Sequence, residues 1–378
     1  MRRLKKFINK DMKKLENIAV LAGDGIGPEV MAQALKALRA IEEKYKHNFK
    51  FKEALMGGIA IDKTGEPLPK ETLDIALAAD AVLLGAIGTP KYADPTLKVR
   101  PEQGLLGLRK ALGLFANIRP VKAYEKLLGL SPIKNVAGSD FVIYRELTGG
   151  IYFGDSGRNE ENSMGYDVMS YERYEVERIA HAAFKSAMNR RSELCLVDKA
   201  NVLEVSRFWR ETVDKVAKEY PSVTYTQLYI DNAAMQIILN PSRFDVILTG
   251  NLFGDILSDE ASVISGSLGL LPSSSIGEDH CLFEPVHGSY PEGAGKDIAN
   301  PVAMILSSAM MLEHFDMIKE AQDIYDAVDH CMEKSIMTED LNPDVGYSCS
   351  QLGDIIESLI LGEDIKLKSV KEGSYSII

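Results

Sequence analysis

Residues 249–259 read TGNLFGDILSD, and this stretch joins a predicted strand to a predicted helix. The largely apolar run at residues 244–248 predicts a buried strand. Gly254 breaks the strand pattern, and helical spacing is expected from Asp255 onward. Asp255 and Asp259 are four residues apart, which places both carboxylates on one face of that helix.

The two carboxylates admit two interpretations. Like charges at this spacing repel each other, which costs a few tenths of a kcal/mol in an isolated helix. In one interpretation Asp255 favours the positive end of the helix dipole and Asp259 is solvated. In the other, both carboxylates share a hard cation such as Mg²⁺, which takes oxygen ligands. The stretch alone does not separate the two.

Strand and helix patterns alternate on both sides of this stretch. Strands are predicted at residues 18–22, 49–54, 81–86, 115–118, 194–197 and 223–230. Helices are predicted near residues 73–79, 174–188, 202–220, 231–239, 300–312, 318–334 and 352–360. The alternation indicates an α/β fold with parallel or mixed sheets flanked by helices.

A glycine-rich turn, GDGIGPE at residues 23–29, follows the first predicted strand. Pro28 fits the first position of the next helix. The dinucleotide fingerprint G-x-G-x-x-G would need glycine where Pro28 stands, so a Rossmann fold is excluded.

The bulk composition narrows the class of protein. The 378 residues suggest two or three domains, and 46% hydrophobic with 26% charged residues is ordinary for a globular protein. A net charge of −12 argues against a nucleic-acid partner. The four cysteines include no C-x-x-C pair, which suits a reducing compartment and predicts a cytoplasmic protein. No apolar run reaches the roughly 18 residues of a membrane helix.

The first dozen residues are basic and lack the apolar region of a signal peptide. We interpret them as a frayed leader, and Met12 could be the true start.

Several charged residues near predicted element ends are candidates for chemistry. Arginine forks bind carboxylates, so Arg109, Arg119 and Arg145 could hold a substrate with two carboxylates, or each could be solvated. Tyr152, which stands between glycines, could donate a proton or simply pack on a loop. Lys199 follows a buried strand, where α/β active sites gather, although a solvated lysine is the commoner case.

Three further features remain open from the residues alone. Asp231 could be the N-cap of its helix or a third carboxylate beside Asp255 and Asp259. Residues 265–277 are rich in glycine and serine and are expected to line a cleft. Residues 284–301 form a long irregular segment whose glycines permit close approach to a ligand.

Seven motifs, taken together and in order, resemble the isopropylmalate/isocitrate dehydrogenase family of metal-dependent β-decarboxylating dehydrogenases. They are GDGIGPE, RPEQGLLGLRK (100–110), FANIRP (115–120), YRELTGGIYFG (144–154), VDKANVLEV (197–205), TGNLFGDILSD and EPVHGSYPEGAGKDIANP (284–301). The resemblance covers nearly all of residues 18–360. Two of the motifs look like the branch that acts on 3-isopropylmalate in leucine biosynthesis.

The resemblance implies roles for the candidate residues. The substrate carboxylates would be held by Arg109, Arg119 and Arg145. Mg²⁺ or Mn²⁺ would be held, with the substrate's C2 oxygen, by Asp231, Asp255 and Asp259. Lys199 would act as base on the C2 hydroxyl while hydride passes to NAD, and Tyr152 would protonate the enolate carbon after CO₂ leaves.

Specificity is also implied by the resemblance. Leu105 and Leu106, with Glu102, match the enzymes whose apolar side chains receive an isopropyl group. The cofactor would be bound by Glu284, His287, Gly288, Ser289, Glu292, Gly293, Ala294, Gly295, Asp297 and Asn300. Glu292 stands where aspartate is usual, and an acid there suits the free ribose 2′-hydroxyl of NAD rather than NADP.

The family's domains are discontinuous, and its active sites are shared in a homodimer. By resemblance, residues 1–114 and 267–378 would form the cofactor-side domain. Residues 115–266 would form the dimerising domain, with a protruding arm near residue 155. Lys199 and Asp231 would reach the site from the partner subunit.

Two other activities compete with this expectation. A sister enzyme would act on D-malate, tartrate, homoisocitrate or isocitrate. A non-catalytic regulatory subunit would have lost the lysine, the tyrosine or the metal carboxylates, all of which are present here.

Overall fold

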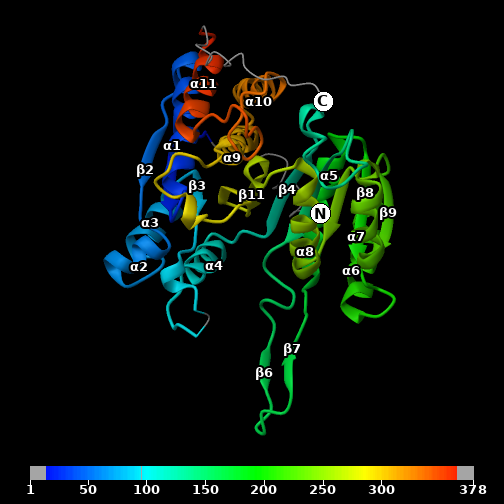
Figure 1. Ribbon diagram of the computed structural model, residues 1–378. Helices are drawn as coiled ribbons and strands as arrows, with labels where there is room; N and C mark the ends of the chain where they lie inside the picture. Colours follow the sequence, from blue (N-terminus) through cyan, green and yellow to red (C-terminus); the bar gives the residue numbers. More distant parts are fainter. Residues whose placement is uncertain (1–13, 95, 364–378) are drawn as a thin grey trace, which may run out of the picture.

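The computed structural model describes residues 14–94 and 96–363 (Figure 1). The predicted leader, Met12, and the outer limits of the expected cofactor-side domain lie outside these residues. Within the described ranges, no helix is long and apolar enough to cross a membrane.

One mixed sheet of ten strands runs through the protein, in the order β2-β1-β3-β12-β11-β4-β5-β10-β8-β9. Its strands are β1 (Asn17–Gly23), β2 (Lys50–Glu53), β3 (Ala81–Ala86), β4 (Ala116–Lys122), β5 (Asp140–Glu146), β8 (Glu193–Asp198), β9 (Thr224–Tyr229), β10 (Val246–Thr249), β11 (Pro272–Ile276) and β12 (Cys281–Pro285). The outer strands pair in parallel, whereas β11 is antiparallel to both β12 and β4, and β4 is antiparallel to β5. The α/β fold with a mixed sheet is confirmed.

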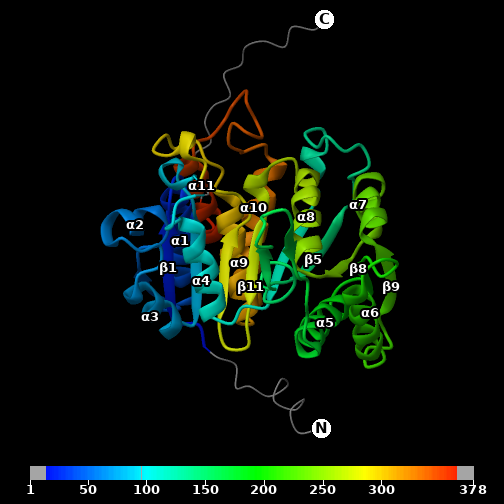
Figure 2. The same cartoon turned by 90° about the horizontal axis from the view of Figure 1, so that it is seen from below.

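Eleven α-helices of the described residues cover this sheet. They are α1 (Gly27–Tyr45), α2 (Gly58–Thr64), α3 (Lys70–Ala78), α4 (Pro101–Ala111), α5 (Arg173–Met188), α6 (Glu204–Ala217), α7 (Ile230–Leu239), α8 (Asn251–Ser262), α9 (Val302–His314), α10 (Ile318–Glu333) and α11 (Cys349–Leu361). Figure 2 shows α1 to α4 and α9 to α11 gathered around one end of the sheet, and α5 to α8 around the other.

The buried apolar side chains follow the same division. Two core clusters draw on residues 15–114 and 270–360, with Leu127 as the one addition from the middle of the chain. Two others draw only on residues 115–264. Segments far apart in sequence therefore share a core at one end of the sheet.

A short hairpin stands away from the rest of the chain (Figure 1). It consists of β6 (Ser156–Arg158) and β7 (Gly165–Asp167), which pair antiparallel. The hairpin begins next to residue 155, near which a protruding arm was expected.

Helix α8 corrects the prediction made from residues 249–259. The helix begins at Asn251, so Gly254 lies inside it and does not mark a boundary. A Cβ at Gly254 would lie 2.6 Å from Cγ of Arg145, so glycine is needed there for close packing of α8 on β5. Asp255 falls outside the first four positions of α8, and the helix-dipole interpretation of that carboxylate is wrong.

Other boundaries also differ from the predictions. Asp231 is not an N-cap, because α7 begins at Ile230 and Tyr229 precedes it. Arg119 lies within β4 rather than after it. Pro28 is the second helical residue, because α1 begins at Gly27.

Several elements did not follow from the sequence pattern, among them β5, β11, β12 and α2. Of the glycine- and serine-rich segment expected to line a cleft, residues 267–269 and Ser273 do line cavities. Residues 272–276 also form strand β11, which is largely buried in the middle of the sheet. Serines do not give the apolar pattern that predicts a buried strand. The hydroxyls of Ser273 and Ser275 accept hydrogen bonds from Asn117 of β4, and local spacing does not reveal this partner. Helix α2 has only seven residues, too few for a clear period.

Candidate active site

The three candidate arginines meet at one cavity of about 340 Å³. It is lined by Leu106, Arg109, Lys110, Leu114, Arg119, Arg145, Leu147, Thr148, Tyr152, Phe153, Asn251 and Asp255. These residues come from α4, β4, β5, α8 and the loop after β5. The sequence separation of the arginines did not predict that they converge, and the structure brings them together.

Asp255 connects two of the candidate residues. Nη1 of Arg145 donates to Asp255 Oδ1 at 2.5 Å, and the Tyr152 hydroxyl donates to Asp255 Oδ2 at 2.7 Å. Burial lowers the pKa of Arg145 to about 10, although Asp255 acts in the opposite direction. Burial, and then the bond to Asp255, raise the pKa of Tyr152, so its hydroxyl keeps its proton.

The second carboxylate of α8 meets Arg119. Nη1 of Arg119 donates to Asp259 Oδ1 at 3.0 Å and to Ser258 Oγ at 2.8 Å. The Asp259 side chain is 73% exposed, against 33% for Asp255. Asp255 and Asp259 thus present oxygen atoms from one helix face, the donor set that a hard divalent cation takes.

Arg109 instead pairs with Glu284, an expected cofactor residue. Nη2 of Arg109 lies 2.6 Å from Glu284 Oε1, and both side chains are mostly buried. Glu284, at the end of β12, therefore holds the arginine of α4 in this structure. Of the expected specificity residues, Leu106 lines the arginine cavity, Leu105 lines an adjoining one, and Glu102 is exposed.

Lys199 and Asp231 form a separate ion pair. The hydrogen bond from Lys199 lowers the pKa of Asp231. Neither residue lines the arginine cavity. No group of three or more metal-ligating side chains occurs among the described residues, so one chain does not bring Asp231 together with Asp255 and Asp259.

Part of the expected cofactor segment lines a larger cavity of about 670 Å³. His287, Gly288 and Asn300 belong to its lining, opposite residues 267–269. Nε2 of His287 is buried without a hydrogen-bond partner among the described residues, and a Cβ at Gly288 would meet open space. This orphaned donor or acceptor and the cavity size fit an organic cofactor.

A smaller cavity of about 190 Å³ shares lining residues with both of these cavities. Arg109 and Arg119 line both this space and the arginine cavity. His287 and Gly288 line both this space and the large cavity. The shared lining residues therefore place the three cavities next to one another.

The remaining expected cofactor residues have other contacts. Ser289 O accepts from the amide of Ile26 at 2.8 Å, and Glu292 is exposed outside the lining of the large cavity. Asp297 accepts from the amide and hydroxyl of Ser350, at 2.7 and 2.6 Å. Gly293 is buried, Ala294 is half-buried and Gly295 is exposed.

Asp24 and Glu29 of the GDGIGPE motif accept hydrogen bonds from main-chain amides of other segments. Neither residue was predicted to have a role. Asp24 accepts from the amides of Gly58, Ile59 and Gly88 at 2.8 to 2.9 Å. Glu29 accepts from the amides of residues 295 and 297. Their place in a motif that is typical of the family was the available signal.

Comparison with known proteins gives consistent results. The model of the isocitrate/isopropylmalate dehydrogenase family matches residues 17–356. A 3-isopropylmalate dehydrogenase of Clostridium pasteurianum is 54% identical over 86% of this chain and 93% of its own length. That of Thermotoga maritima is 53% identical over 90% of this chain and 97% of its own.

Solved structures agree with these relatives. An isocitrate dehydrogenase from Methylococcus capsulatus superposes with a TM-score of 0.82 at 35% identity, covering 92% of this chain and 100% of its own. A β-decarboxylating dehydrogenase from Thermococcus kodakarensis gives 0.77 at 37% identity, covering 92% and 96%.

Proposed function

The chain belongs to the isocitrate/isopropylmalate dehydrogenase family, and from this premise we propose that it oxidises and decarboxylates 3-isopropylmalate with NAD in leucine biosynthesis. Relatives that carry the name 3-isopropylmalate dehydrogenase share half or more of its sequence over most of its length. The observation that carries the proposal is the cavity in which three arginines meet an apolar leucine beside Tyr152 and Asp255.

The cavity suits a dicarboxylate with a branched apolar group. Arg109, Arg119 and Arg145 would bind the two carboxylates, because a guanidinium matches a carboxylate in charge and geometry. Leu105 and Leu106 would contact the isopropyl group. The third carboxylate of isocitrate would lie against an apolar side chain there, which favours 3-isopropylmalate, with two carboxylates, over isocitrate.

A divalent metal would be held by Asp255 and Asp259, with Asp231 from a second copy of the chain. When bound, Mg²⁺ or Mn²⁺ supplies Lewis-acid polarisation of the substrate's C2 oxygen. Tyr152 and Arg145 already hold both oxygens of Asp255, so the carboxylate is oriented in advance.

Two residues would move protons. Lys199 would take the proton of the C2 hydroxyl as general base. Tyr152 would donate its proton to the enolate carbon, and its raised pKa keeps that proton in place until then. NAD would be bound in the cavity lined by His287, Gly288 and Asn300, and it would accept the hydride from C2 of the substrate.

A homodimer would complete the site. Helices α7 and α8 lie next to each other, and both expose large apolar side chains. These side chains are Met235, Ile238 and Leu239 on α7 and Ile256 on α8, each about half exposed. An exposed apolar face of this kind marks a protein interface, and α8 also carries Asp255 and Asp259. A partner docked there would bring its own Lys199 and Asp231 toward these carboxylates.

Domain division and location are part of the proposal. Residues 1–114 with 267–378, and residues 115–266 with the arm, would form the two domains, because the buried clusters draw on the same segments. All four cysteines are buried, and none forms a disulfide among the described residues, which fits the reducing cytoplasm.

A substrate and cofactor panel tests the proposal. NADH formation is measured with 3-isopropylmalate, D-malate, tartrate, homoisocitrate and isocitrate, with NAD or NADP, and with or without Mg²⁺. We expect 3-isopropylmalate with NAD to give the highest kcat/KM and chelation of the metal to abolish it. A clear preference for D-malate would favour the sister-enzyme alternative, and no turnover by the homomer would favour a regulatory subunit.

A further inference from the structure

Two of the three cavity arginines are held by buried asparagines. Nε and Nη2 of Arg145 donate to Asn251 Oδ1 at 3.1 and 2.8 Å. Nε of Arg119 donates to Asn117 Oδ1 at 2.9 Å. Both asparagines are only 1% exposed. Each therefore satisfies the inner edge of a guanidinium that has little access to water.

The orientation of both amides is fixed by their partners. An arginine can only donate, so Oδ1 must face it and Nδ2 must face an acceptor. Nδ2 of Asn251 donates to Gly149 O at 3.1 Å. Nδ2 of Asn117 donates to the hydroxyls of Ser273 and Ser275 at 2.9 and 3.2 Å. Each asparagine thus ties its arginine to a second segment of the chain.

The sheet places the two pairs side by side. Asn117 of β4 is the cross-strand partner of Arg145 of β5. Asn117 and Arg119 are two residues apart on one strand, so their side chains share a face. On both arginines the asparagine accepts at the Nε edge, whereas Nη1 donates to an acid of α8.

The asparagines are neutral acceptors, which sets them apart from the partner of Arg109. Arg109 has a carboxylate, Glu284, at 2.6 Å. Arg119 and Arg145 each already pair with one acid of α8 through Nη1. The amide at the Nε edge satisfies further hydrogen bonds without placing a second negative charge on the arginine.

We propose that Asn117 and Asn251 are positioning residues for substrate binding, which hold the clamp arginines with neutral acceptors so that each keeps its orientation without a second negative charge beside it. The proposal rests on the proposed function, in which Arg119 and Arg145 bind substrate carboxylates. It assigns to the asparagine of TGNLFGDILSD and to that of FANIRP a role that acts through the arginines.

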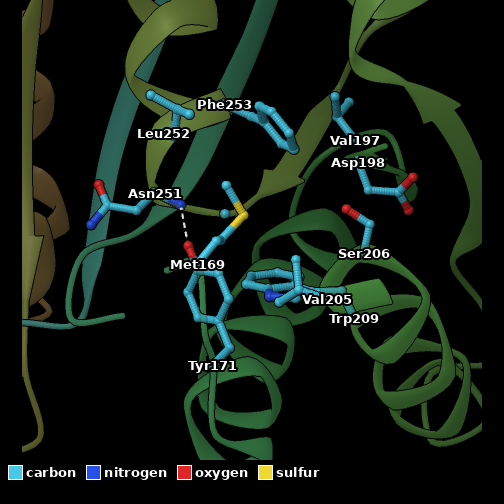
Figure 3. Close-up of a pocket in the computed structure, with 11 residues that line it drawn as sticks. Met169, Tyr171, Val197, Asp198, Val205, Ser206, Trp209, Asn251, Leu252 and Phe253 are labelled. Carbon is cyan, nitrogen blue, oxygen red and sulfur yellow. Dashed lines mark hydrogen bonds between the residues drawn. The ribbon is translucent and has the colours of Figure 1, made fainter. Parts of the chain in front are cut away.

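Asn251 also links Arg145 to the loop that carries Tyr152. Its main-chain N–H donates to the Tyr171 hydroxyl at 2.7 Å, the bond drawn in Figure 3. A Cβ at Gly150 would lie 2.3 Å from that hydroxyl, so the loop packs directly on Tyr171. Asn251 therefore holds Arg145 and the start of the Tyr152 loop in one arrangement.

The test replaces the amide by a carboxylate of the same shape. Asn117→Asp and Asn251→Asp keep the acceptor for arginine and add one negative charge. We expect each to raise KM for the hydroxy acid by about 10- to 100-fold, the effect of losing one charge-assisted contact. KM for NAD should stay within about twofold, because the change acts on the arginines and not on the cofactor cavity.

In Asn117→Asp the hydroxyls of Ser273 and Ser275 can turn to donate to the carboxylate, and the longer bond to Ser274 O, at 3.3 Å, is lost. Its melting temperature is therefore recorded. Asn251→Asp loses its bond to Gly149 O, so its melting temperature is recorded as well. Asn342→Asp is the matched control, since its Nδ2 donates to Ser335 O at 3.0 Å and it adds the same charge away from the arginines.

Unchanged KM for the hydroxy acid in both aspartate variants would overturn the proposal. An equal rise in both KM values would do the same, because it would indicate a general structural role. KM is measured with whichever acid of the panel the wild type turns over fastest. A wild type that prefers another diacid would refute the proposed substrate but not this comparison.

Discussion

At the scale of single residues, Asp255 is the point where the candidate groups meet. Arg145 and Tyr152 each bind one of its oxygens, and Asp259 one turn later binds Arg119. Lys199 is absent from this cluster and pairs with Asp231. The chemistry proposed for Lys199 therefore depends on a second copy of the chain, which separates its role from that of the other residues.

Replacement of Lys199 tests the proposed base. Lys199→Ala should lower kcat by at least about 10²-fold, the usual loss when a general base is removed. The dimer should remain, because the substitution shortens one side chain and leaves the apolar face of α7 and α8 unchanged. Turnover is followed as NADH formation and the assembly by sedimentation. Lys218→Ala, at the exposed end of α6, is the control, and near-normal turnover of Lys199→Ala would exclude it as the base.

At the scale of elements, helix α8 is placed by its glycine. Gly254 lets the stem of Arg145 pass against the helix, with 2.6 Å between that stem and a hypothetical Cβ. The same helix exposes Ile256 on another side. One helix thus supports an arginine, presents two carboxylates and offers an apolar surface.

Substitution of this glycine should be harmful although alanine favours helices. Gly254→Ala should destabilise the protein by about 1–3 kcal/mol, the usual cost of overpacking, and should raise KM by displacing Arg145. Gly107→Ala in α4 is the control, because its Cβ would meet only Leu68 at 3.6 Å. That variant should gain about 0.4–1 kcal/mol. Urea unfolding of both variants checks the difference, and equal effects would contradict the packing argument.

At the scale of the whole molecule, the unpaired faces indicate how two copies would meet. The apolar face of α7 and α8 lies beside Asp255, and the arm of β6 and β7 exposes further apolar side chains. These are Met164, Tyr166 and Val168. A second copy would cover both surfaces and supply the missing lysine.

A charge placed on this face should separate the subunits. Ile256→Lys should give a monomer with little activity, because burying an unpaired ammonium in an interface is costly. Leu77→Lys on α3 places the same charge at an exposed leucine elsewhere and should leave mass and activity unchanged. Light scattering gives the mass. An active monomeric Ile256→Lys variant would refute shared sites.

Mixed dimers test the sharing directly. Lys199→Ala and Asp255→Asn should each be inactive alone. After unfolding and refolding together, about one quarter of wild-type activity should return, because half the dimers are mixed and each holds one intact site. No recovery, with mixed dimers shown by mass spectrometry, would place both residues in a site within one chain.

The sequence by itself determined the α/β class, most helices, the shared face of Asp255 and Asp259, and the family, because these depend on local periodicity and on motifs read in order. The tertiary structure decided that three arginines from α4, β4 and β5 converge, that β11 runs antiparallel in the middle of the sheet, and that Gly254 serves packing. It also placed Asn117 and Asn251 behind two arginines. These features depend on contacts between residues far apart in the chain, and the free energy of such contacts leaves no local pattern in the sequence.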